Sequence, residues 1–273
     1  MKQILVATDF SPSAANAMEY AMGLASLLGL EVCAIHAIHP TEGINNSTYN
    51  AIFIEDYYRN KREALKEWAA IFSVKSGLEN VRITTLCEVG FLKTVITNHI
   101  HHHKVELLAM GITGATGLSG IVGSNASMMV TKVKIPTLII PLESKLPNTP
   151  TITLATDYET KLSATDVTAL NEMIKAFHSK QMEVLYVEEK TDAKHIKTGE
   201  ERIKSLIPHT NLQFNYLKDS TPLSGIIDFI EKNETDILCL VKHHHNIIYR
   251  LFNRSTVNQI MNRTVKAILV LHE

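Results

Sequence analysis

The residues best placed to do chemistry in this chain are glycines. The stretch MGITGATGLSGIVGSNAS, residues 110–127, contains five glycines and no charged side chain, and it follows the apolar run VELLA. Glycine permits positive φ angles and lets backbone N–H groups approach an anion closely, and a helix N-terminus favours phosphate. The stretch therefore predicts a phosphate-holding loop, with Gly111 and Gly114 in the loop and Ser124 at the start of the next helix.

The two best-known phosphate-binding motifs are missing. No GxxxxGK[ST] segment is present, so no P-loop lysine would reach a β- or γ-phosphate. The dinucleotide motif GxGxxG belongs after the first strand of its fold, and the first predicted strand here ends in ATDFSPS without glycine. Glycine content alone leaves open a surface loop of small residues that binds nothing.

Apolar runs of strand length alternate with amphipathic segments along the whole chain, which is typical of parallel β-α-β units. Ser11 and Pro12 predict the start of the first helix, and Gly29 predicts its end. In such sheets ligands bind beyond the carboxyl ends of the strands, where the glycine stretch falls. The first half predicts strands over 3–8, 31–38, 81–87, 106–110 and 137–142, and helices over 12–28, 51–75, 91–103 and 124–133.

The second half repeats the first after the polar linker ESKLPNTP, and 273 residues are long enough for two domains. We therefore predict two domains, 1–143 and 150–273. Four segments recur in order: ILVATDF (4–10) as ITLATDY (152–158), CAIHA (33–37) as VLYVE (184–188) shifted by one residue so that His36 falls on Tyr186 and Ala37 on Val187, ELLAMG (106–111) as DILCLV (236–241), and PTLIIPL (136–142) as AILVLHE (267–273).

Taken together, ILVATDFS, IHA and MGITG…GSNAS resemble the universal stress protein family, whose nucleotide-binding members carry M-G-x2-G-x9-G-S/T. The resemblance covers nearly the whole chain as a tandem pair. It implies an α/β fold of two tandem Rossmann-like domains, of the adenine nucleotide alpha hydrolase-like type. Each would be a five-stranded parallel sheet flanked by helices. It also implies a stress-response protein that binds an adenine nucleotide (ATP, ADP or AMP), with or without Mg²⁺.

The resemblance also implies a set of site residues in the first half. Asp9 and the backbone at Ala37 would hold adenine and ribose, and the glycines and Ser124 would hold phosphates. Asn125 would donate its backbone N–H. The full set is Ala7, Asp9, Ala37, Met110, Gly111, Gly114, Gly123, Ser124 and Asn125.

Two positions depart from the family pattern. Ala7 stands where members often have proline, which is a mild change. Eight residues separate Gly114 from Gly123 instead of nine. We expect this shortening to shift or weaken the hold on a triphosphate, while the adenine and ribose contacts survive.

The second half departs much further. Aligned from DILCLV, the three glycines of the motif become Val241, His244 and Arg254, and only Ser255 keeps its type. Side chains with a Cβ make positive φ costly and would fill the space of a phosphate. We expect this half to bind no nucleotide and to serve as a structural partner. The family's last strand usually pairs two domains, which predicts an intramolecular pseudo-dimer of the halves; a homodimer of the chain remains open.

Histidines form two runs, HIHHHK (99–104) and HHH (243–245). His99 and His103 lie four apart on a predicted helix, a spacing that could hold a transition metal. No cysteine or carboxylate accompanies them at metal spacing, so we predict no dedicated metal site. His36, on a strand, is predicted to be a packed or hydrogen-bonded residue rather than a general base.

Composition excludes several classes of protein. The net charge of −1 gives no basic field for nucleic acid, and no apolar run approaches a membrane span or a signal peptide. Three cysteines in strand-like segments without a CxxC pair predict reduced thiols. We expect a cytoplasmic protein with no nucleic-acid or membrane partner.

The sequence names no catalytic machinery. It has no GxSxG motif, no Cys–His pairing by motif and no kinase motif, so no nucleophile or base is identified. Binding is therefore favoured over catalysis, and the identity of a protein partner stays open. Two alternatives remain: a scaffold of the same fold that binds no nucleotide, and, more weakly, a slow ATP hydrolase.

Overall fold

The computed structural model describes residues 2–42, 51–112, 124–158, 162–187, 193–217, 222–242 and 266–272. The first half contains β1 (Gln3–Ala7), α1 (Pro12–Leu28), β2 (Glu31–Ile38), α2 (Ala51–Ser76), β3 (Ile83–Val89), α3 (Leu92–His102), β4 (Val105–Gly111), α4 (Ser124–Lys132) and β5 (Thr137–Ile140). The second half contains β6 (Ile152–Thr156), α5 (Thr168–Ala176), β7 (Gln181–Val187), α6 (Ala193–Leu206), β8 (Asn211–Leu217), α7 (Pro222–Lys232), β9 (Ile237–Lys242) and β10 (Ala267–His272). All the elements predicted for the first half are present, with ends that differ by at most two residues.

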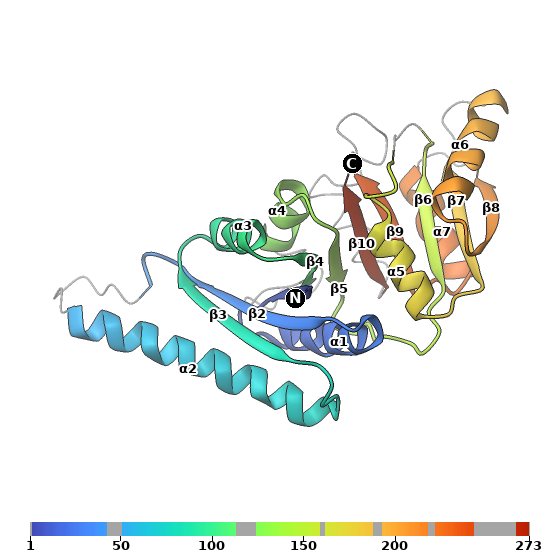
Figure 1. Cartoon of the computed structure of the whole chain (residues 1–273). Helices are drawn as coiled ribbons and strands as arrows, with labels where there is room; N and C mark the ends of the chain where they lie inside the picture. Colours follow the sequence, from blue (N-terminus) through green and yellow to red (C-terminus); the bar gives the residue numbers. More distant parts are fainter. Residues whose placement is uncertain are drawn as a thin grey trace.

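The strands form one continuous sheet in the order β3-β2-β1-β4-β5-β10-β9-β6-β7-β8 (Figure 1). Each half contributes five parallel strands, and the two halves have the same internal order, which confirms the predicted fold class. The halves join where β5 and β10 pair antiparallel, with Ile139 opposite Ile268 and Leu138 opposite Leu269.

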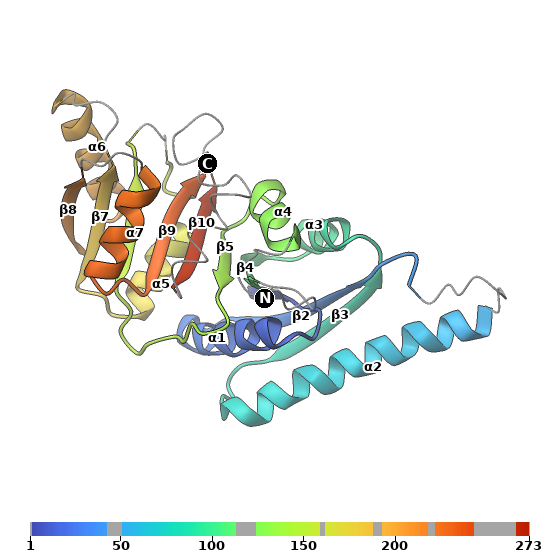
Figure 2. The ribbon, with the colours of Figure 1, turned by 180° about the vertical axis from the view of Figure 1, so that it is seen from behind.

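Helices cover both faces of this sheet, as Figures 1 and 2 show from opposite sides. α1, α2, α5 and α6 pack against one core, which contains Met18, Phe72, Met173 and Ile203. α3, α4 and α7 pack against the core on the other face. The central strands β1, β5 and β6 are buried along their whole length, which explains why they read as continuous apolar runs.

The ends of α1 follow from their capping residues. The Ser11 hydroxyl accepts the N–H of Ala14 at 3.2 Å, and proline follows at the first helical position. At the other end Gly29 takes the left-handed conformation, with φ of 64°, and its N–H bonds the carbonyl of Ala25. Both helix-end predictions are confirmed. They matter because α1 begins at the mouth of the site described next.

Candidate functional site

A cavity of about 680 Å³ opens at the carboxyl ends of the strands in the first half. β1 lies between β2 and β4, so consecutive crossovers leave it in opposite directions. Ligands of open α/β sheets bind at such a switch point, and the volume lies within the roughly 300–1,000 Å³ common for small-molecule sites. The N-terminal parts of α1, α3 and α4 and the segment after β2 contribute the rest of the wall.

The cavity brings together six of the nine residues that the sequence singled out. They are Ala7, Asp9, Ala37, Met110, Gly111 and Asn125. Ser124 begins α4, directly before Asn125. Gly114 and Gly123 lie outside the described residues, so the phosphate contacts assigned to them stay predictions.

A tight turn after β1 presents Asp9 to the cavity. The N–H of Phe10 bonds the Thr8 hydroxyl at 3.0 Å, and the N–H of Ser11 bonds Asp9 Oδ1 at 3.1 Å. Phe10 takes a left-handed φ of 65°, which is uncommon for a bulky residue, and the equivalent Tyr158 in the second half does the same with φ of 59°. Asp9 stays half-buried at the cavity wall, and Ala14 in the first turn of α1 lies beside it.

The structure corrects one of the two reasons that the sequence suggested for Gly111, while its approach to a phosphate stays a prediction. We expected it to adopt a positive φ, but among the described glycines only Gly29 and Gly77 do so. Instead, a Cβ at Gly111 would lie 2.7 Å from the carbonyl carbon and the carbonyl oxygen of Ser13, closer than real Cβ contacts. Gly111 therefore allows the end of β4 to touch the first turn of α1.

His36 is a packed, hydrogen-bonded residue, as predicted. It is 7% exposed, and its Nδ1 lies 2.8 Å from the Thr8 carbonyl oxygen, to which the ring N–H donates. Its ring also packs on Phe10, with centroids 4.6 Å apart. Burial lowers the pKa of His36, so the imidazole favours its neutral form. His36 therefore stabilises the turn that carries Asp9, because it contacts Thr8 before it and Phe10 after it.

Sequence reasoning missed the outer wall of the cavity. Glu42 accepts the His39 N–H and the Tyr57 hydroxyl, each at 3.0 Å, and its carboxylate lies 3.7 Å from Lys61 Nζ. Burial alone would raise the pKa of Glu42, but these partners lower it overall. Other lining residues that the sequence did not single out include Thr8, His39, Gly90, Phe91 and residues 92–94 at the start of α3. Thr8, His39 and Gly90 directly follow the ends of β1, β2 and β3, which was the available signal.

Among the described residues, the equivalent place in the second half contains closely packed side chains. Asp157 is only 5% exposed. The ring of Tyr158 stacks on that of Tyr186, with centroids 4.7 Å apart and planes 8° apart. Gly199 of α6 lies against Tyr158, because a Cβ there would fall 2.5 Å from the Tyr158 Cβ. Val241, which replaces the first motif glycine, is buried in β9. His244 and Arg254, which replace the other two, lie outside the described residues, as does Ser255.

His99 of α3 and the C-cap residue His103 stack ring on ring. The rings of His99 and His103 lie 4.2 Å apart at 18°, and His99 Nε2 is 2.8 Å from the side-chain nitrogen of Gln3. Within the described ranges, no group of three or more His, Cys, Asp or Glu residues is arranged to hold a metal ion. The run 243–245 lies outside those ranges. The described part of the chain also contains no helix long and apolar enough to cross a membrane.

The fold and the cavity define an α/β protein with a cavity at the switch point of a parallel sheet, in a chain whose two halves contribute strands to that sheet in the same order. The model of the universal stress protein family matches residues 1–141. The chain belongs to the universal stress protein family.

Individual relatives agree with this assignment. The universal stress protein MJ0531 of Methanocaldococcus jannaschii is 29% identical over 144 residues, 51% of this chain and 81% of the relative. MJ0577 of the same organism is 27% identical over 158 residues, 51% of this chain and 94% of the relative. The crystal structure of a universal stress protein from Archaeoglobus fulgidus matches with a TM-score of 0.75 at 17% identity, covering 98% of this chain and 97% of its own. That match extends the shared fold over both halves.

Proposed function

We propose that the first half binds an adenine nucleotide in the 680 Å³ cavity, and that the protein acts in the stress response by sensing nucleotide or regulating a partner. The supporting observation is that residues far apart in sequence, Asp9, Ala37 and Asn125 among them, line this one cavity. They are the residues that the family resemblance assigns to base, ribose and phosphate.

The chemistry of the wall suits such a ligand. The Asp9 carboxylate can accept hydrogen bonds from ribose hydroxyls or from a base amino group. Ala7, Ala37 and Met110 supply apolar surface for the flat face of a base. The first turn of α4, at Asn125, offers backbone N–H groups and the positive end of a helix dipole to phosphate. Mg²⁺ would accompany ATP or ADP through the phosphates.

The second half fits the role of a structural partner. We infer that domains 1–143 and 150–273 form an intramolecular pseudo-dimer, because β5 and β10 pair antiparallel across the join. The buried Asp157 and the stacked pair Tyr158 and Tyr186 support a single nucleotide site per chain.

Isothermal titration calorimetry with ATP, ADP, AMP and cyclic AMP, with and without Mg²⁺, tests the proposal. Ala37→Trp introduces a large side chain at the cavity wall and should weaken binding at least about tenfold, or 1.4 kcal/mol. Ala70→Trp is the matched control, because Ala70 is exposed on α2 and does not line the cavity. If the wild-type chain binds none of these nucleotides, the scaffold alternative is favoured.

A further inference from the structure

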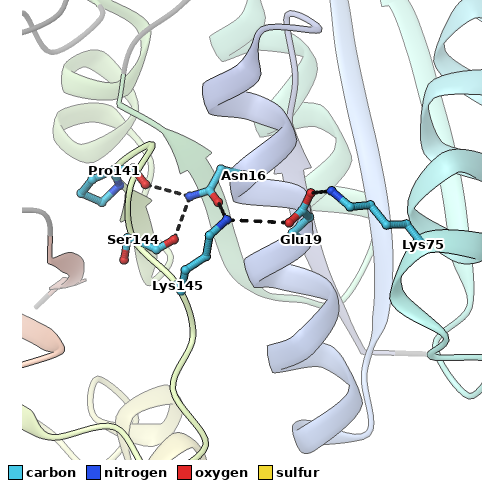
Figure 3. A network of polar contacts seen from close by, with 6 residues as sticks. All are labelled: Asn16, Glu19, Lys75, Pro141, Ser144 and Lys145. Atoms are coloured by element: carbon cyan, nitrogen blue, oxygen red, sulfur yellow. Dashed lines mark hydrogen bonds and ion pairs between the residues drawn. The ribbon is translucent and has the colours of Figure 1, made fainter.

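One face of α1 contacts the linker between the two halves. Asn16, Glu19, Tyr20 and Gly23 lie at positions i, i+3, i+4 and i+7, so they form a single stripe along the helix. All four line the same groove as linker residues 144–148. Figure 3 shows how the polar part of this stripe meets the linker.

Asn16 carries most of the polar contact. Its side-chain nitrogen donates to the carbonyl oxygens of Pro141 and Ser144, at 2.8 and 2.9 Å, and its oxygen accepts from Lys145 Nζ at 2.9 Å (Figure 3). The residue is 6% exposed. Both amide hydrogens and the amide oxygen are therefore used. The Pro141 carbonyl also accepts the Ser144 N–H at 3.0 Å, so a side chain without the amide would remove one of the two donors to Pro141 and the Asn16 donor to the Ser144 carbonyl.

The rest of the stripe extends the contact. The Glu19 carboxylate lies 3.9 Å from Lys145 and 2.5 Å from Lys75 of α2, so it joins the linker to a second helix (Figure 3). Gly23 leaves room for Leu146, whose Cδ2 would lie 3.0 Å from a Cβ at this position. These contacts hold the linker along more than one turn of α1.

Tyr20 connects the same stripe to the second half. It is 3% exposed and belongs to the same buried core as Ile152 and Leu154 of β6. Burial, followed by the carboxylate of Asp236, raises the pKa of Tyr20. Asp236 precedes β9 and accepts the N–H of Thr151, at the start of the second half, at 2.9 Å. The stripe therefore contacts the linker and, through Tyr20, packs in the same core as β6, the strand to which the linker leads.

The first turn of α1 belongs to the nucleotide cavity. Ser13 touches Gly111 at the end of β4, and Ala14 lines the cavity wall. Asn16 begins the next turn of the same helix. A ligand that orders the first turn of α1 therefore acts directly on the helix that contacts the linker, because no loop separates the two regions.

We propose that α1 couples nucleotide binding in the first half to docking of the linker, and that Asn16 is the positioning residue of this coupling. The proposal rests on the proposed function, because it assigns a regulatory consequence to nucleotide binding. The two states are a docked and a released linker. Because coupling between binding equilibria is reciprocal, nucleotide stabilises the docked linker, and a variant that releases the linker weakens nucleotide binding.

Trypsin cleavage after Lys145 in the full-length chain reports the released state, since local opening is required for cleavage. Cleavage after Lys232, at the end of α7, is the reference for opening elsewhere. Asn16→Ala should raise the ratio of cleavage at Lys145 to cleavage at Lys232 about tenfold. Thr198→Ala, which removes an exposed hydroxyl of α6 that donates to the Lys194 carbonyl and does not line the linker groove, should leave the ratio unchanged. Asn16→Asp, which lacks the two donors but keeps the partner of Lys145, serves if Asn16→Ala does not fold.

Saturating AMP or ATP should lower the same ratio in the wild-type chain at least about threefold. Calorimetry should show weaker binding of the same nucleotide to the Asn16 variant. Nucleotide binding with an unchanged cleavage ratio would overturn the coupling alone. Absence of nucleotide binding to the wild-type chain would overturn the proposed function and the coupling with it. An unchanged ratio in both Asn16 variants would show that the residue does not hold the linker.

Discussion

Gly111 and Ser13 touch backbone to backbone: a Cβ on Gly111 would fall 2.7 Å from the carbonyl carbon and the carbonyl oxygen of Ser13. The contact joins the end of β4 to the first turn of α1 at the wall of the cavity. Backbone atoms cannot rotate away as a side-chain methyl can. The first glycine of the motif is therefore required by packing, whatever it does for a ligand.

Gly111→Ala should destabilise the protein by about 1–3 kcal/mol, since the helix or the strand must shift to admit the methyl group. Urea unfolding measures the change. Gly90→Ala is the matched control, because its Cβ would meet only the side-chain methyl Cγ2 of Val95, at 3.0 Å. We expect the control to cost less than about 1 kcal/mol. Equal losses in both variants would contradict the packing argument.

The nucleotide stoichiometry should be one per chain. The first half offers a cavity lined by half-buried Asp9, whereas in the second half Asp157 is buried and Tyr158 stacks on Tyr186. Calorimetry on the full chain, supported by native mass spectrometry, measures the number of bound nucleotides. Two equivalent sites would mean that the aromatic stack opens and that the second half is not merely structural.

Stability should fall in mild acid because of His36. Burial lowers its pKa in the folded protein, whereas in the unfolded chain the value is about 6.5. Below that pH the unfolded chain binds a proton that the folded protein resists, so the free energy of unfolding decreases as pH falls. One such group contributes a slope of up to about 1.4 kcal/mol per pH unit, and its full contribution is present above pH 6.5.

Urea unfolding between pH 7.5 and 5.5 measures that slope in the wild-type chain and in His36→Gln. The glutamine variant should show the shallower slope, even if it is less stable at every pH. His99 adds to the slope in both proteins, because burial and then His103 lower its pKa. His101→Gln, which changes an exposed histidine on α3, should retain the wild-type slope. Identical slopes in all three proteins would remove His36 from the explanation.

The fold was readable from the sequence because its signals are local. Strand-length apolar runs, the cap at Ser11 and the stop at Gly29 each depend on a few neighbouring residues. The internal repeat then fixed the alignment between the halves. Strand register confirms this alignment at one point. Ala7 pairs with Met110, directly before Gly111, and the equivalent Ala155 pairs with Leu240, directly before Val241.

The parts of the site that depend on distant contacts were not readable. Asn16 looks like an ordinary polar residue on a helix, and its partners are carbonyl groups 125 and 128 residues away. Backbone acceptors leave no pattern in a sequence. The motif identified Gly111, but whether it serves a positive φ or a close approach depends on the distance from β4 to α1. Glu42 likewise gains its role only when α2 brings Tyr57 beside it.

The isolated first half, residues 1–145, should dimerise. In the full chain β5 is buried and pairs with β10, so removing the second half exposes an apolar strand edge. Unpaired strand edges seek a partner, and a second copy offers the same antiparallel arrangement. Sedimentation velocity over a range of concentrations measures the association. A stable monomer at high concentration would show that the edge of β5 is not self-complementary.

The last prediction concerns the number of phosphates that the site distinguishes. One residue is missing between Gly114 and Gly123 relative to the family motif, a loss of roughly 3.3–3.6 Å of extended chain. Asp9 and Ala37 lie far from this deletion in sequence, so base and ribose contacts should survive. The shortening falls where the later phosphates would be held, and no P-loop lysine compensates for it.

We therefore expect the affinities for AMP and ATP to differ by less than about tenfold, or 1.4 kcal/mol. Calorimetry with both nucleotides in the presence of Mg²⁺ measures the ratio. Inserting one glycine after Gly117 restores the nine-residue spacing and should raise the affinity for ATP relative to AMP. An ATP preference above a hundredfold in the wild-type chain would contradict the prediction. It would mean that the eight-residue loop still closes on the γ-phosphate, so that the deletion has no effect on triphosphate recognition.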